Sequence, residues 1–340
     1  MKSSFKLYFV LFIATAASLA CVTLMGTPIP AAPILPPAAT LPPVTEEAAA
    51  TAAPAAELAC PLITQRVMEA TLAEGEEELV DETYIVTYLV QGDKISEPTY
   101  EDVSADLQDE QDNAELHQQI WDYFTALIPL EQRSALAEYS LTTDGAGGTL
   151  AAVSQTWYNR KLWALEVDVA DVSDPYSLTF TLIHEFGHLL TLGPEQVPPD
   201  KAVFDNPDDN DIYLRAVSQC PRYFPGEGCA NADSYINAFY DEFWAELHDE
   251  WNEINLEEDE DLYYEKLDDF YNKYKDRFVT DYAATNPEED MAETWAFFIL
   301  NPAPAGETIA EEKILFFYQY PELVALREEI LNNVCANLSE

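Results

Sequence analysis

Residues 174–194 read DPYSLTFTLIHEFGHLLTLGP, and this stretch decides which fold the chain is expected to adopt. Within it, His184 and His188 stand four positions apart around Glu185, in a chain with only four histidines. In a helix, positions i and i+4 lie one above the other on the same face, so both imidazoles can reach one metal ion while Glu185 lies beside it. An H-E-x-x-H pattern on a helix is typical of zinc hydrolases, and it predicts a Zn²⁺ site.

The same stretch carries the signals of a buried helix. Asp174 can cap its N-terminus with Pro175 as the first helical residue, and Gly193 followed by proline ends it. Gly187 leaves room for close approach of another backbone. A plain buried helix with two hydrogen-bonded histidines is the simpler interpretation, but it leaves the charge of Glu185 unexplained in an apolar stretch. The apolar face consists of Leu182, Ile183, Phe186, Leu189 and Leu190.

Residues 1–58 read as an export leader and a tether. Two lysines precede an apolar run from Leu7 to Ala20, which is too short to span a bilayer and is typical of a signal peptide. Cleavage after this run would leave Cys21 for lipid modification, although the residues before it form an imperfect lipoprotein box. Residues 22–58 are rich in Pro, Ala and Thr, and we expect them to be disordered. The protein is therefore expected to be extracellular or on the cell surface, with membrane contact only through a lipid on Cys21.

The remaining residues, 59–340, are numerous enough for one folded unit with a substantial core. The composition of the chain limits which classes of partner it can bind. Without the two lysines of the leader, 14 basic and 63 acidic residues remain, a formal charge of −49. This charge argues against nucleic acid as a partner. Much of the acid lies on helical faces such as 255–269, where a solvated surface is the simpler reading. We expect a monomer.

Four cysteines follow the leader, an even number in a chain that is expected to be exported, so disulfides are the default expectation. Three pairings exist, and we favour Cys60 with Cys335 and Cys220 with Cys229. A zinc–thiolate site is not expected, because the chain has no C-x-x-C pair.

Periodicity predicts an α+β protein, a small N-terminal mixed sheet followed by a mostly helical C-terminal part. The predicted strands are Thr83–Val90, Leu150–Trp157 and Leu162–Val169. Residues from 193 to about 211 read as irregular. Besides the motif helix, the predicted helices are Ala114–Ile128, Ser234–Ile254, Glu257–Phe278, Pro287–Leu300, Thr308–Tyr318 and Pro321–Val334.

A catalytic zinc site normally has three protein ligands and an open fourth position, so a third ligand must be found. The metzincin continuation would need glycine and histidine where the chain has Thr191 and Pro194, which excludes that class. His117 and His248 lie in acid-rich amphipathic stretches, where a surface or capping role is expected. A glutamate is more plausible, and two acidic helical segments offer one: DEFWAE at 241–246, and EEDMAE at 288–293. Spacing alone does not choose between them.

Residues 282–293 read YAATNPEEDMAE, which resembles the Tyr-x-x-Thr-Asn/Ser-x-x-Glu-x-x-Ala-Glu segment of gluzincins. With the H-E-x-x-H motif, the chain is similar to secreted bacterial zinc metallopeptidases of this type, including lethal-factor-like and Pro-Pro endopeptidase catalytic domains. The resemblance rests on these two segments. It implies a zincin-like fold in which Glu289 is the third zinc ligand, Tyr282 is the transition-state donor, and Glu293 orients a ligand histidine.

One departure from such relatives is the separation of about a hundred residues between His188 and Glu289. It implies a helical insertion at about 194–276 within the folded unit. The insertion keeps Glu242 and Glu246, in the first acidic segment, open as alternative ligands.

The expected reaction is hydrolysis of a peptide bond by a zinc-bound water, with Glu185 as general base and Tyr282 holding the oxyanion. The substrate would be a peptide or protein, and the negative field of the chain argues against acidic ones. Two other functions use the same features. One is a non-catalytic surface binding protein on a zincin fold, and the other is a zinc hydrolase of a non-peptide bond.

Overall fold

The computed structural model describes residues 59–71, 82–146, 148–207, 209–257 and 259–338. The predicted leader (1–21, with Cys21) and tether (22–58) lie outside these residues. The elements, in chain order, are α1 (Pro61–Thr71), β1 (Thr83–Gln91), β2 (Lys94–Tyr100), α2 (Gln108–Asp112), α3 (Ala114–Leu127), η1 (Leu130–Arg133), β3 (Leu136–Thr143), β4 (Ala151–Gln155), β5 (Trp163–Asp168), α4 (Pro175–Leu192), α5 (Lys201–Phe204), α6 (Asn210–Gln219), α7 (Tyr235–Phe243), α8 (His248–Asn255), α9 (Glu260–Lys273), η2 (Lys275–Arg277), η3 (Tyr282–Ala284), α10 (Pro287–Leu300), α11 (Ile309–Phe317) and α12 (Pro321–Asn337).

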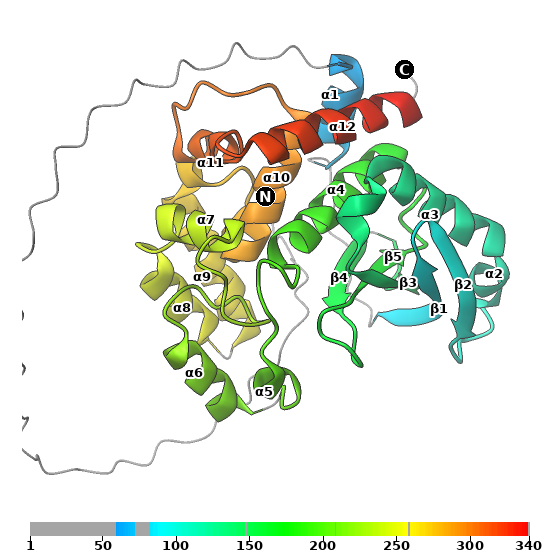
Figure 1. Ribbon diagram of the computed structural model, residues 1–340, viewed down its shortest axis with the longest axis horizontal. Coiled ribbons are helices and arrows are strands. Elements are labelled where there is room, and N and C mark those ends of the chain that lie inside the picture. Colours follow the sequence, from blue (N-terminus) through cyan, green and yellow to red (C-terminus); the bar gives the residue numbers. More distant parts are fainter. Residues whose placement is uncertain (1–58, 72–81, 147, 208, 258, 339–340) are drawn as a thin grey trace, which may run out of the picture.

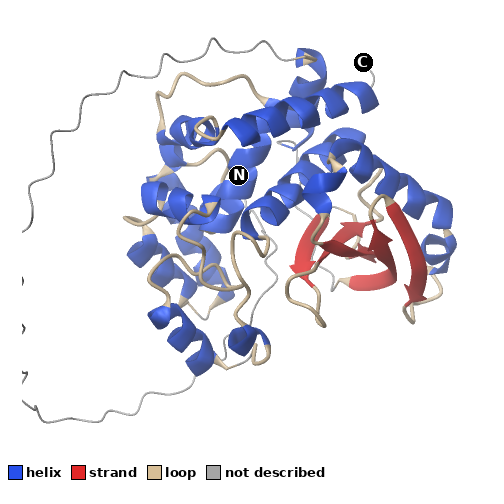
Figure 2. Cartoon of the chain, viewed as in Figure 1, coloured by secondary structure: helices blue, strands red, loops and turns tan. Residues whose placement is uncertain are grey.

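The strands form one mixed sheet in the order β2-β1-β3-β5-β4. Strands β3 and β5 are parallel, and the other neighbours are antiparallel. The central strand β3 contributes Tyr139 and Leu141, both fully buried. Figure 2 shows the strands gathered on one side of the molecule and helices filling the rest. The predicted α+β class, with a small N-terminal mixed sheet and a mostly helical remainder, is confirmed.

Three predicted strands correspond to β1, β4 and β5, but β2 and β3 were not predicted. Strand β2 is an edge strand that contains Pro98 and is largely exposed, so it lacks the alternation of a half-buried strand. Strand β3 is buried along most of its length and also lacks that alternation. Neither strand therefore shows the alternation of apolar and polar residues on which the prediction relied.

The single helix predicted at Ser234–Ile254 is wrong, because the chain breaks between α7 and α8. The break follows Trp244, whose ring is fully buried and whose Nε1–H donates to Asp290 Oδ2 at 2.7 Å. The stretch predicted to be irregular, 193 to about 211, contains the short helix α5. Helix α6 begins at the end of this stretch and continues beyond it. The predicted insertion at 194–276 thus contains α5 to α9.

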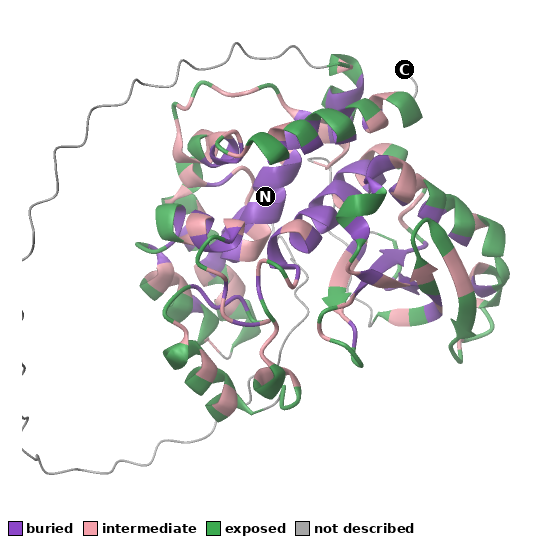
Figure 3. Cartoon of the chain, in the orientation of Figure 1, coloured by how far each residue is buried: buried purple, intermediate pink, exposed green. Residues whose placement is uncertain are grey.

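Helix α4 lies between the sheet and the C-terminal helices (Figure 1) and packs against β4, α1 and α10. It is buried along most of its length, as is α10 (Figure 3). The two helices approach closely at Gly187, where an added Cβ would stand 3.0 Å from the Trp295 ring and 3.2 Å from the Cα of Ala292. The close backbone approach expected at Gly187 is therefore confirmed.

The described part of the chain contains two disulfides. Cys60 pairs with Cys335 and ties α1 to α12, and Cys220 pairs with Cys229 within the segment before α7. Both predicted pairings are confirmed, and they are consistent with an exported protein. Among the described residues, no helix has the length and apolar character needed to cross a bilayer.

Candidate metal centre

Helix α4 presents the three motif residues on one face. Its N-terminus is capped by Asp174, whose side chain accepts from the N–H of Tyr176, and Pro175 is its first residue. The helix ends before Gly193, as predicted. The motif residues sit in the second half of the helix and are nearly enclosed: His184 is 5% exposed, Glu185 7% and His188 8%.

Helix α10 brings a second set of acids to the same place. Asn286 caps its N-terminus by accepting from the N–H of Glu289 at 2.8 Å, and Pro287 is its first residue. Glu289 therefore lies in the first turn, and Glu293 lies one turn later on the same face. Close approach of the two helices at Gly187 puts this face against the histidines.

Three atoms from the two helices converge. The Nε2 atoms of His184 and His188 are 3.1 Å apart, and Glu289 Oε2 lies 3.1 Å from the first and 3.3 Å from the second. Glu185 is beside them, with its Oε1 4.0 Å from His184 Nε2. Ligand atoms at about 2.0–2.1 Å from a tetrahedral zinc ion stand about 3.3 Å from one another, so the donor set and its spacing fit zinc.

The other ring nitrogen of His184, Nδ1, also has a hydrogen-bond partner. Its Nδ1 lies 3.0 Å from Glu293 Oε1, and the other oxygen of Glu293 accepts from the Thr280 hydroxyl at 2.7 Å. A carboxylate at Nδ1 keeps the proton on that nitrogen and leaves the Nε2 lone pair for a metal. Glu293 therefore occupies the position expected of a carboxylate that orients a histidine.

Burial and charge act in opposite directions on this group. Burial lowers the pKa of His184, but its hydrogen bonds to Glu289 and Glu293 outweigh that effect and raise the pKa well above the usual value. Burial raises the pKa of Glu289, yet the nearby histidines hold it well below the usual range. Burial raises the pKa of Glu185 to about 7, despite the two histidines. Glu185 is thus able to exchange a proton near neutral pH.

Tyr282 lies at the edge of the same group. Its ring centroid is 5.8 Å from that of His184, and its hydroxyl is within hydrogen-bonding reach of Glu289. Burial, with the charges of Glu289 and Glu185, raises the pKa of Tyr282 well above its usual value. The hydroxyl therefore keeps its proton at neutral pH and is available as a donor.

The alternative acids are elsewhere. Glu242 and Glu246 are exposed, and Glu246 pairs with Arg277 at 2.5 Å. Within the described part of the chain, the acids that lie within 4.0 Å of the His184 or His188 ring nitrogens are Glu185, Glu289 and Glu293. Of the two acidic segments, the structure therefore brings the second to the motif.

The remaining histidines are also separate from this group. His248 is partly exposed, in agreement with the surface role expected for it. The surface role expected for His117 is wrong, because its side chain is fully buried between α3 and the sheet. Its Nδ1 bonds the Tyr88 hydroxyl and its Nε2 bonds the Glu110 carbonyl, both at 2.9 Å. The capping role expected for it is consistent with the second contact.

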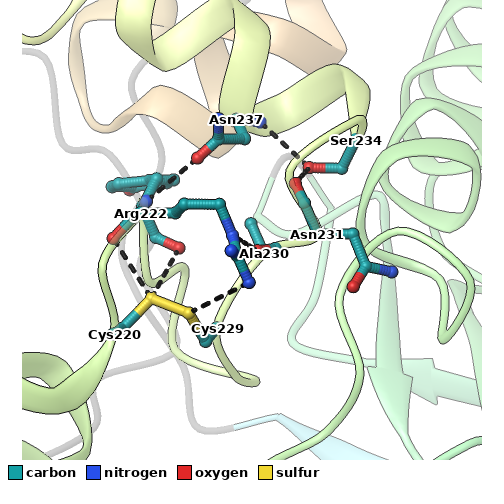
Figure 4. Close-up of a disulfide and its surroundings, with 8 residues drawn as sticks. Cys220, Arg222, Cys229, Ala230, Asn231, Ser234 and Asn237 are labelled. Carbon is teal, nitrogen blue, oxygen red and sulfur yellow. Dashed lines mark hydrogen bonds between the residues drawn. A yellow bond between two sulfur atoms is a disulfide. The ribbon is translucent and has the colours of Figure 1, made fainter.

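A disulfide-bonded loop adds one further acid, Glu227, within electrostatic reach of His188. Figure 4 shows the Cys220–Cys229 bond, with Asn237 of α7 turned toward the loop. Asn237 accepts from the N–H of Tyr223 at 3.1 Å, and the Tyr223 hydroxyl donates to Glu288 Oε1 at 2.8 Å. Burial, aided by Glu288, raises the pKa of Glu227 in the same loop to about 8. This side of the site is rich in acid and lies within electrostatic reach of His188.

Sequence reasoning missed two supporting residues. Thr280, which bonds Glu293, precedes the resembling segment and belongs to no periodic pattern, so no signal could have identified it. Asn286 caps the first turn of α10; the helix was predicted to begin at Pro287, but the capping role of the residue before it was not identified, although Asn followed by Pro is a recognisable helix start.

Comparison of the chain with protein-family models, with curated proteins and with solved structures finds no match to any of them. The resemblance to gluzincins therefore stays a prediction from the two quoted segments.

Proposed function

We propose that the protein is an exported zinc metallopeptidase with a zincin-like fold, acting outside the cell or on its surface. The observation that carries the proposal is the convergence of His184 Nε2, His188 Nε2 and Glu289 Oε2 within 3.3 Å of one another, with Glu185 alongside. These three residues would hold the metal. Zinc bound there would supply a Lewis acid and a water of lowered pKa beside Glu185.

The side chains around the three proposed ligands have the roles that hydrolysis of a peptide bond requires. Glu185 takes a proton from the attacking water and returns it to the leaving amine. The Tyr282 hydroxyl donates to the oxygen that becomes negatively charged when water adds to the carbonyl. Glu293 keeps the proton of His184 on Nδ1.

Strand β4 offers a place for the substrate backbone. It forms the edge of the sheet next to α4, and in the described part of the chain it pairs with β5 alone. An extended peptide can add to such an edge through main-chain hydrogen bonds. Because the chain as a whole carries a formal charge of −47, we propose that neutral or basic side chains are accepted more readily than acidic ones.

A second candidate is a binding protein in which the zinc is structural. The observation that favours it is the low exposure of the site, where the Glu289 side chain, at 18%, is the most exposed of the three ligands. A structural zinc has a closed coordination shell, so no activity would depend on Glu185.

The deciding experiment is mass-spectrometric cleavage of an unbiased peptide library by zinc-loaded protein, beside Glu185→Gln. The matched control is Glu195→Gln, the same change at an exposed residue just after α4. We expect one zinc per chain in all three proteins, and at least about a 100-fold loss of cleavage in Glu185→Gln alone. Full cleavage by a zinc-loaded Glu185→Gln variant would contradict the assignment of Glu185 as the general base of this site. Zinc binding without cleavage of any peptide would favour the structural zinc, and cleavage of another bond type would indicate a different hydrolase.

A further inference from the structure

A second cluster of possible ligands lies at the edge of the sheet where the parallel strands β3 and β5 end. Asp144 follows β3, Asp168 is the last residue of β5, and Asp171 lies in the loop that leads into α4. One carboxylate oxygen from each of the three lies within 4.8 Å of the others. None of these residues belongs to the site built around His184.

Asp168 joins the two loops. Its Oδ2 accepts from the N–H of Asp144 at 2.8 Å, and its Oδ1 accepts from the N–H of Ala170 at 2.6 Å. Its side chain is almost fully buried. Burial, with the charge of Asp171, raises its pKa to about 6 in spite of these hydrogen bonds. No ion pair among the described residues includes Asp144 or Asp168, so protein cations do not offset this charge.

Asp144 provides an independent sign of a missing partner. It is only 9% exposed, and its Oδ2 accepts from the N–H of Thr149 at 2.8 Å. Its Oδ1 is buried and has no hydrogen-bond partner among the described residues. The backbone of Gly148 lies so close to this carboxylate that a Cβ there would collide with it. A buried carboxylate oxygen without a donor is rare in proteins and calls for a ligand.

We propose that Asp144, Asp168 and Asp171 bind a Ca²⁺ ion. Three carboxylates are oxygen donors of the kind that hard cations prefer, and Ca²⁺ accepts irregular sets completed by backbone carbonyls and water. The ion relieves the repulsion among the acids and gives Asp144 Oδ1 its partner. It also ties the loop before α4 to the end of β3, and so holds the start of the helix that carries His184.

The test is calorimetric titration of CaCl₂ into zinc-loaded protein in calcium-depleted buffer with 150 mM KCl, which screens diffuse binding to a highly acidic chain. Wild type is compared with Asp144→Asn and with Asp269→Asn, which removes the same charge from an exposed position on α9. We expect one saturable site with Kd of about 10⁻⁴–10⁻³ M, the range of extracellular modules. Asp144→Asn should weaken it at least tenfold, and Asp269→Asn should leave it unchanged.

Thermal unfolding of the same proteins shows whether the variants fold. Ca²⁺ should raise the midpoint of wild type and of Asp269→Asn but not of Asp144→Asn. Without Ca²⁺, Asp144→Asn should unfold at or above the wild-type midpoint, because one of three like charges is gone. If Asp144→Asn does not fold, Asp171→Asn, at a half-buried position, takes its place with the same expectation. Absence of a saturable site in wild type, or equal binding by wild type and the folded variant, would overturn the proposal.

Discussion

His117 and His184 are both almost completely buried, one against the sheet and the other where α4 crosses α10. Each has hydrogen-bond partners on both ring nitrogens. The partners of His117 are a tyrosine hydroxyl and a backbone carbonyl, whereas His184 faces two carboxylates and a second imidazole.

The charge of the partners gives the two residues opposite properties. Burial lowers the pKa of His117, so its ring is neutral and serves packing. The carboxylates raise the pKa of His184, and Glu289 Oε2 lies close to the Nε2 atoms of both motif histidines. Burial of a histidine therefore says little about function. The informative feature is the convergence of like donors, which repel one another unless a proton or a metal ion lies between them.

The largest expected difference between the two regions is in metal binding. His184→Ala should lower the zinc content from about one ion per chain to about none and abolish cleavage, because it removes one of the three proposed ligands. His117→Ala should keep both properties and lower only the stability. Zinc measured by elemental mass spectrometry, with cleavage rates, tests this. A fully zinc-loaded His184→Ala protein would break the comparison.

The next largest effect is expected when the hydrogen-bond partner of each histidine ring is removed. Glu293→Ala should weaken zinc binding by about 10–100-fold, because His184 loses the carboxylate at Nδ1. Tyr88→Phe, which removes the hydroxyl at His117, should leave zinc affinity unchanged. Competition with a chromogenic chelator measures both values, and equal affinities for the two variants would argue against a role of Glu293 in orienting His184.

A smaller effect is expected at the helix crossing itself. Gly187→Val should destabilise the fold by about 1–3 kcal/mol, since its side chain would push against Trp295 and the backbone of Ala292. Zinc affinity should fall as well, because α10 carries Glu289. Gly187→Ala should show the same trend to a lesser degree. Denaturant unfolding gives the free energies, and a fully stable valine variant would show that the helices are not held by this contact.

The smallest effect is the pH dependence carried by His117. Its pKa in the folded state lies below that of the unfolded chain, about 6.5, so the unfolded state binds the proton more readily. The stabilisation is complete above about pH 6.5 and is lost as the pH falls toward the folded-state pKa. The stability difference between wild type and His117→Gln should therefore shift against wild type from pH 7 to pH 5. If the free energies of unfolding of the two proteins, measured with denaturant, changed in parallel between pH 7 and pH 5, this prediction would be contradicted.

Structural features that depend on neighbouring residues could be predicted from the sequence, whereas features that depend on distant residues could not. The capped helix at 175–192 and the start of α10 were visible because caps and apolar spacing involve neighbouring residues. The break after Trp244 was not, because it arises where a buried indole reaches Asp290, 46 positions away. Strand β3 was missed for a similar reason, since it is recognised by pairing with β1 and β5.

The amino-acid sequence by itself determined the face shared by His184 and His188, with Glu185 beside it, because the i, i+4 geometry of a helix is a local property of the backbone. It also determined the α+β order of the elements. Only the tertiary structure decided which acids lie against that face, since Glu289 is 105 positions from His184 and reaches it through a helix contact made at Gly187. The same holds for the aspartates at the ends of β3 and β5, which parallel pairing brings to one edge of the sheet.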